Sequence, residues 1–124
     1  MSQKKKTTVY SCSGCSNVAQ LANRIAVKLD RDNEATMSCI AGVGGDVVSL
    51  VKQAKIAEEI LVLDGCALAY ASNCLKRHSI EADLHIILTD YELTKNYRSD
   101  FDDQEFHFAY EKVLKSLFDL HPEK

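Results

Sequence analysis

The sequence lacks the features that would place a protein in or across a membrane. No apolar run approaches the roughly 20 residues that a membrane-spanning helix needs. The basic run at residues 4–6 is followed at once by Thr7, Thr8, Val9 and Tyr10. This stretch is too short for the apolar region of a secretory signal peptide. We therefore expect a cytosolic protein that has no membrane partner.

A basic balance of charge is also lacking. The 124-residue chain has a formal net charge of -3, and residues 4–6 form its only basic run. Nucleic-acid-binding domains usually present a basic patch, and we therefore expect no nucleic-acid partner. Residues 1–6 are predicted to be a disordered basic tail, because polar chain termini are poorly ordered unless they are held by contacts.

Cysteine, by contrast, is abundant. The chain has five cysteines, an odd number, in a composition that is otherwise ordinary for a globular domain, with 46% hydrophobic and 27% charged residues. Cytosolic thiols are kept reduced, and a chain of this length buries a core without disulfides. The cysteines therefore predict metal binding or thiol chemistry rather than a disulfide framework.

Strand and helix patterns alternate along the chain. Strands are predicted at 7–11, 35–40, 59–63 and 84–88, and helices at 18–29, 47–54 and 67–78, with a closing helix that runs to Phe118. Ser16 or Asn17 can cap the first helix and Asp46 the second, while Asp102 and Glu105 resemble a capping box for the last.

Residues 42–45 contain three glycines and are predicted to be a flexible loop. They match neither a P-loop nor a GxGxxG motif, and a plain turn is favoured there over an anion site.

This alternation predicts an α/β fold. We expect a three-layer open parallel sheet of about four strands in the order 2-1-3-4, with helices on both faces. The absence of a linker or repeat predicts that residues 7–124 form a single α/β domain.

Four cysteines follow the ends of three predicted strands: Cys12, Cys15, Cys39 and Cys66. The carboxyl ends of parallel strands meet at one edge of the sheet, where open α/β sheets bind ligands. Neighbouring strands are only about 4.8 Å apart, which brings their loops together. A tetrahedral zinc site needs thiolates about 2.3 Å from the metal, and the Cys12-x-x-Cys15 spacing suits two ligands on one loop, with Gly14 allowing the turn. The alternative is that Cys39 and Cys66 are small buried hydrophobic residues.

Three further residues have open or structural interpretations. Cys74 lies eight residues after Cys66 in a predicted helix, roughly 12 Å along its axis, and is interpreted as packing. Asp64 either supports the site or caps the helix after it. His85 alternates with apolar neighbours on a strand and is interpreted as a core histidine whose hydrogen bonds are satisfied.

Three segments in this order are similar to those of a known family. They are Cys12-Ser13-Gly14-Cys15-Ser16 after a strand, Cys39-Ile40-Ala41-Gly42-Val43-Gly44-Gly45, and Leu63-Asp64-Gly65-Cys66. Together they resemble the DGC family, which consists of small bacterial and archaeal proteins named for the Asp-Gly-Cys triplet and inferred to bind zinc. The resemblance covers roughly residues 8 to 95. It implies metal binding through Cys12, Cys15, Cys39 and Cys66 and implies no enzymatic reaction.

Three functions from different classes stay open. The favoured one is a zinc-binding protein with a structural or sensing role, and therefore not a self-sufficient enzyme. The second is an iron–sulfur electron carrier, because four thiolates suit a cluster equally well. The third is a thiol redox or phosphocarrier enzyme that uses Cys12 or Cys15 at a helix N-terminus. A protein partner and the oligomeric state are left open.

Overall fold

The computed structural model describes residues 6–121. Its elements are β1 (Thr7–Ser11), α1 (Asn17–Arg31), β2 (Thr36–Met37), α2 (Ile40–Gly44), α3 (Val48–Ile56), β3 (Glu59–Asp64), α4 (Tyr70–Lys76), β4 (Leu84–Ile87), the 3-10 helix η1 (Leu88–Tyr91) and α5 (Asp103–Leu120). Residues 1–5 of the predicted basic tail lie outside the described residues. Lys6 is described, and its backbone N–H donates to Glu58 Oε1 at 2.9 Å.

The four strands form a parallel sheet in the order β2-β1-β3-β4, as the alternation of elements predicted. β3 pairs with strands on both sides, with Val9 opposite Leu61 and Leu63 opposite Ile86. All six of its residues are buried, which suits a central strand covered on both faces.

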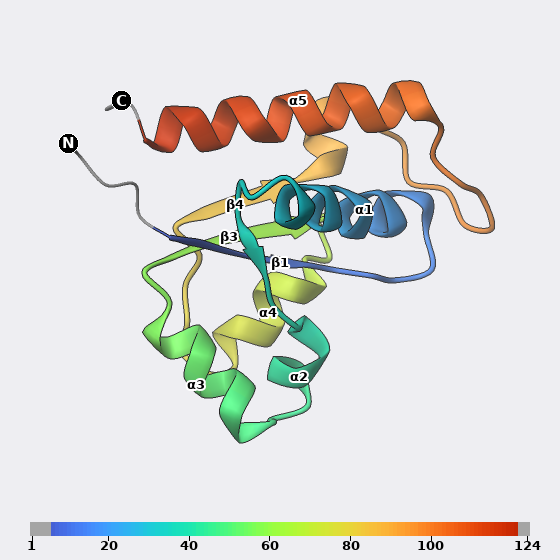
Figure 1. Ribbon diagram of the computed structural model, residues 1–124. Coiled ribbons are helices and arrows are strands. Elements are labelled where there is room, and N and C mark those ends of the chain that lie inside the picture. The colour runs from blue at the N-terminus through green and yellow to red at the C-terminus, as the bar shows by residue number, and fades with distance from the viewer. Residues whose placement is uncertain (1–5, 122–124) are drawn as a thin grey trace.

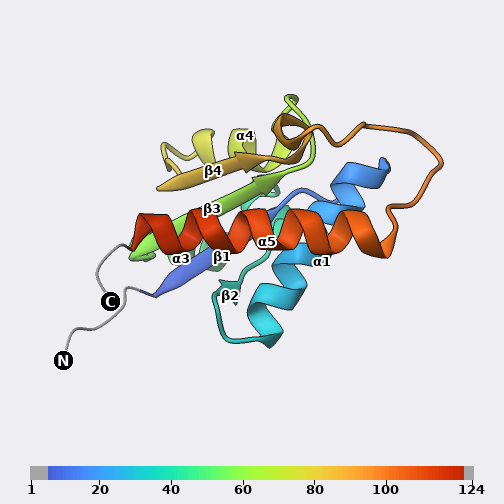
Figure 2. The same ribbon diagram turned by 90° about the horizontal axis from the view of Figure 1, so that it is seen from above.

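Helices cover both faces of the sheet, which confirms the predicted three layers. Figure 1 shows α1 and α5 on one face and α2, α3 and α4 on the other. Seen from above, α5 lies beside α1 and crosses the strands (Figure 2). No helix in the described part of the chain has the length and apolar character needed to cross a membrane.

Two predicted helix starts are confirmed in detail. Ser16 is the N-cap of α1, and its side chain accepts a hydrogen bond from the Ala19 N–H at 3.2 Å. Asp102 and Glu105 form a complete capping box at α5, with distances of 2.8 and 3.0 Å. The inner face of α5 is apolar as predicted, except that Phe118, near its end, is 58% exposed.

The segment after β1 and α1 differs most from the prediction. β2 ends at Met37 rather than at residue 40, because Cys39 becomes the N-cap of α2. The predicted glycine loop is therefore mostly the short helix α2. Gly42 permits close packing, since a Cβ there would lie 2.0 Å from Leu50 Cδ1.

Two other predicted helix starts are wrong. Asp46 does not cap α3, because its backbone has a φ of 65° and Val47 is the N-cap. The Asp46 carboxylate instead pairs with Arg77 and His78 at 3.1 and 3.0 Å. α4 begins at residue 70 rather than 67, after Ala69 in the left-handed region.

Candidate functional site

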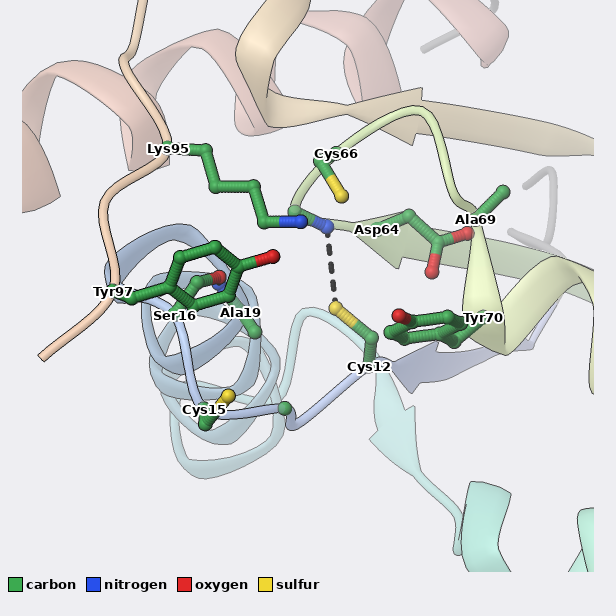
Figure 3. A pocket seen from close by; sticks show the side chains of 12 residues that line it. Cys12, Cys15, Ser16, Ala19, Asp64, Cys66, Ala69, Tyr70, Lys95 and Tyr97 are labelled. Carbon is green, nitrogen blue, oxygen red and sulfur yellow. Dashed lines mark hydrogen bonds between the residues drawn. The ribbon is translucent and has the colours of Figure 1, made fainter.

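A small pocket opens at the carboxyl edge of the sheet, between the ends of β1 and β3 (Figure 3). The loop after β1, the start of α1, the loop after β3 and the segment before α5 all contribute to its wall. Its lining residues are Cys12, Gly14, Cys15, Ser16, Ala19, Asp64, Gly65, Cys66, Ala69, Tyr70, Lys95 and Tyr97. The predicted position of the site, at the strand ends, thus coincides with a pocket that contains three of the five cysteines.

Cys12 is the buried thiol of this pocket. Its backbone N–H extends the β1–β3 pairing by donating to the Leu63 carbonyl at 3.0 Å, and the residue is only 5% exposed. The Gly65 N–H donates to Cys12 Sγ at 3.2 Å. Burial raises the pKa of the Cys12 thiol, and the hydrogen bond from Gly65 lowers it only in part. Cys12 is therefore a poor nucleophile in the absence of a metal, because the thiolate is the reactive form.

Gly65 has a packing role. A Cβ at this position would lie 2.7 to 2.8 Å from backbone atoms of Val18 and Ala19 in the first turn of α1. The loop after β3 can therefore reach the start of α1 only through a residue without a side chain. Gly14, expected to allow a turn, has no positive φ, and a Cβ there would make ordinary contact with Ala19 at 3.5 Å.

Asp64 caps the helix that follows it, as one of the two interpretations left open by the sequence predicted, and it also lines the pocket. The residue is fully buried, and its carboxylate accepts hydrogen bonds from the backbone N–H groups of Ala71 and Ser72 at 2.9 and 3.2 Å. His85 Nε2 lies 2.7 Å from the same carboxylate. His85 is thus satisfied as predicted, but its side chain is 29% exposed and does not lie in the core.

Cys66 faces the same space as Cys12, whereas Cys15 lies apart from them on its loop (Figure 3). Cys66 is partly buried and Cys15 is exposed. Cys39, exposed at the start of α2, does not line the pocket. The structure therefore brings the thiols of strands β1 and β3 to one pocket and places the fourth predicted ligand outside it.

Cys74 lies outside the pocket and packs between two helices. A Cβ on Gly44 would lie 2.9 Å from Cys74 Sγ, which places this thiol at the contact between α2 and α4. All five cysteines are free. Within residues 6–121, no group of three or more histidine, cysteine, aspartate or glutamate side chains is close enough to hold a metal ion.

Lys95 and Tyr97 are pocket residues that sequence reasoning missed. Lys95 Nζ lies 5.0 Å from the centre of the Tyr97 ring. The neighbouring side chains of Tyr97 and Cys66 raise the pKa of Lys95. The two residues belong to a stretch that reads from sequence only as polar and irregular. Nothing local indicates that it lies against the cysteines, since it is held there by contacts with α1.

Comparison with known proteins places the chain in a family. No solved structure matches it. A curated relative from Pseudomonas aeruginosa, the anaerobic and virulence modulator AnvM, is 54% identical over 97 residues, which cover 78% of this chain and 74% of the relative. The sequence model of the DGC domain matches residues 8–113, a span that includes the CxxC loop, the Asp-Gly-Cys triplet and the whole pocket. The chain therefore belongs to the DGC family.

Proposed function

We propose that this chain binds a zinc ion through Cys12, Cys15 and Cys66. The observation that carries the proposal is that these three thiols, from the ends of two neighbouring strands, line one pocket. Zinc accepts thiolates as ligands in a tetrahedral arrangement and deprotonates them on binding. The raised pKa of Cys12 is compatible with this, because the metal rather than the protein supplies the charge that stabilises the thiolate.

The donor set suits zinc in a second respect. The Gly65 N–H already donates to Cys12 Sγ at 3.2 Å, and such outer contacts to the ligands support metal centres in general. Cys15, on an exposed loop, is the ligand whose position would have to change most. The fourth coordination position is then either open or filled by Cys39, as the sequence predicted. When bound, zinc would supply positive charge that holds the loops after β1 and β3 together.

A regulatory role suits this chain better than a metabolic reaction. The relative is named a modulator, and the pocket contains no activated nucleophile at Cys12. If Cys39 fills the fourth position, the closed thiolate site serves structure or sensing, because it leaves no position for a reacting water. We place this activity in the cytosol, where reduced thiols remain available to a metal.

The test is metal analysis of protein purified without oxygen or chelator. We expect about one zinc per chain and a colourless solution, with zinc lost in Cys12→Ser and Cys66→Ser. Cys74→Ser is the matched control, because that thiol packs between two helices, and it should keep its zinc. Cys39→Ser separates a three-thiolate site, which keeps zinc, from a four-thiolate site, which loses it.

Two results would contradict the proposal. A brown protein with several irons per chain would favour the electron-transfer alternative, because iron–sulfur clusters absorb visible light whereas zinc does not. A metal-free protein with rapid alkylation of Cys15 or Cys12 would favour the thiol enzyme. In that case the pocket residues should be tested for a substrate instead.

A further inference from the structure

One wall of the pocket comes from a segment far along the chain. Residues 94–97, which we call the strap, lie between η1 and α5. Lys95 and Tyr97 of the strap line the pocket, as do Cys12 and Cys66. Figure 3 shows the two strap side chains on one side of these thiols and the start of α4 on the other. Cys12, which is only 5% exposed, is therefore enclosed in part by a segment that belongs to no helix or strand.

Asn17, the first residue of α1, fastens the strap to that helix. Its side-chain amide donates to the Thr94 carbonyl at 2.9 Å and accepts from the Asn96 N–H at 2.6 Å. Its backbone N–H also donates to the Asn96 carbonyl at 3.0 Å. Asn17 is only 4% exposed, and water therefore has little access to compete for these bonds. The strap is thus held against α1 by three hydrogen bonds that share one residue.

The strap lies between two apolar anchors. Leu93, directly before it, is buried, and Phe101, a few residues after it, packs against the core. Between these anchors, Thr94 and residues 96–100 are exposed. Arg98 has a φ of 58°, in the left-handed region that residues with a side chain rarely adopt. Exposed segments with few apolar contacts open at a lower free energy than the whole molecule, and the strap has this character.

We propose that the strap is a gate over the thiol pocket and that Asn17 is its latch. Opening breaks the hydrogen bonds of Asn17 and removes Lys95 and Tyr97 from the wall, which exposes Cys12 to solvent while the sheet and its helices stay folded. Asn17 does not itself line the pocket, and it therefore controls access to the thiol rather than the reactivity of the thiol. The inference goes beyond the proposed function, because it holds for any ion or reagent that must reach Cys12.

The experiment follows alkylation of Cys12 by iodoacetamide in reduced, metal-free, folded protein, with each thiol quantified by peptide mass spectrometry. We expect Cys12 to react faster by about tenfold or more in Asn17→Ala, because two side-chain hydrogen bonds that favour the closed state are lost. Cys74, which packs between α2 and α4, is the internal reference, and its rate should not change. Asn73→Ala is the matched control, because the Asn73 amide also donates to a loop carbonyl, that of Leu68 at 3.0 Å, but not to the strap. It should leave the Cys12 rate unchanged.

Low concentrations of urea separate local opening from global unfolding. Local opening exposes little surface, and alkylation through it stays nearly constant, whereas alkylation through global unfolding rises with the full urea dependence of stability. Asn17→Asp is a second variant that protects the start of α1, because an acidic residue favours the first turn of a helix. It keeps an oxygen for the Asn96 N–H but has no amide to donate to the Thr94 carbonyl. Cys12 should therefore react faster in this variant as well.

Each outcome decides the matter. Faster alkylation of Cys12 in both Asn17 variants, with little dependence on urea and an unchanged rate at Cys74, supports the gate. An unchanged Cys12 rate in the variants overturns it, and so does an increase that follows the full urea dependence and affects Cys74 equally. Because the protein is metal-free throughout, a chain that binds no zinc would end the proposed function and leave the gate to this test, and a failed gate would leave the proposed function standing.

Discussion

Replacing Gly65 by alanine tests how tightly the loop after β3 is seated on α1. The added Cβ would lie 2.7 Å from the Val18 carbonyl carbon and 2.8 Å from both the Val18 oxygen and the Ala19 nitrogen. All three are backbone atoms in the first turn of a helix, and no flexible side chain can move aside. Either α1 or the loop between β3 and α4 must shift.

The expected cost follows from this contact. Extra atoms forced into a well-packed region destabilise a protein by about 1 to 3 kcal/mol. For a chain of this size that range corresponds to a fall in Tm of about 4 to 12 °C. The Gly65 N–H would move with the loop, and its hydrogen bond to Cys12 Sγ, now 3.2 Å, would weaken.

The assay is urea and thermal unfolding of reduced, metal-free protein. Gly14→Ala is the matched control on the facing loop, because its Cβ would lie 3.5 Å from the Ala19 side chain, an ordinary contact distance. It should change stability by less than about 1 kcal/mol. A Gly65→Ala protein as stable as Gly14→Ala would refute the reasoning and show that the close approach is not needed for folding.

Two further predictions concern other groups. Asp64→Ala should lower the free energy of unfolding by about 2 to 4 kcal/mol in urea titrations, because it leaves two buried N–H groups at the start of α4 without an acceptor. His85→Ala removes only the exposed partner and should lower the free energy of unfolding clearly less. Equal losses in the two variants would contradict this explanation. Burial, followed by the hydrogen bond to Asp32, raises the pKa of Tyr110 to about 12. The unfolded chain therefore releases the proton first, and stability should be complete below about pH 10 and fall as the pH rises through 12. Tyr110→Phe should show a smaller loss over this range, and an identical loss would show that other groups cause it.

The sequence predicted the sheet well because its signals are local or topological. The buried run of β3 and the alternation of strands with helices were sufficient for the order 2-1-3-4. The caps at Ser16 and Asp102 were predictable because the interacting groups lie three residues apart.

The predicted flexible loop at residues 42–45 was wrong because glycines there serve close packing within a helix. Gly42 and Gly44 lie inside α2, where an added Cβ would lie 2.0 Å from Leu50 Cδ1 and 2.9 Å from Cys74 Sγ, so that these side chains would have to shift. A sequence pattern does not distinguish this use of glycine from a flexible loop. The same unexpected helix begins at Cys39 and leaves that thiol exposed beside the predicted site rather than in its wall.

The candidate site was predicted in position but not in full composition. Cys12 and Cys66 come directly after strands β1 and β3, and the sequence pattern predicts where these two strands end. Lys95 lies beside the pocket on a segment that Asn17 binds at Thr94 and Asn96, a contact between residues almost 80 positions apart. No propensity or spacing rule encodes such a contact, and tertiary structure is needed to find it.

The Asp-Gly-Cys triplet acts as a joint between the layers of the molecule. Asp64 holds α4 on one face of the sheet, Gly65 seats against α1 on the other, and Cys66 faces the pocket between them. These three residues could not be grafted onto another scaffold as a metal-binding cassette, because two of them depend on helices that the new host would lack. For protein engineering, the smallest portable unit of this site is the sheet edge together with both of its helices.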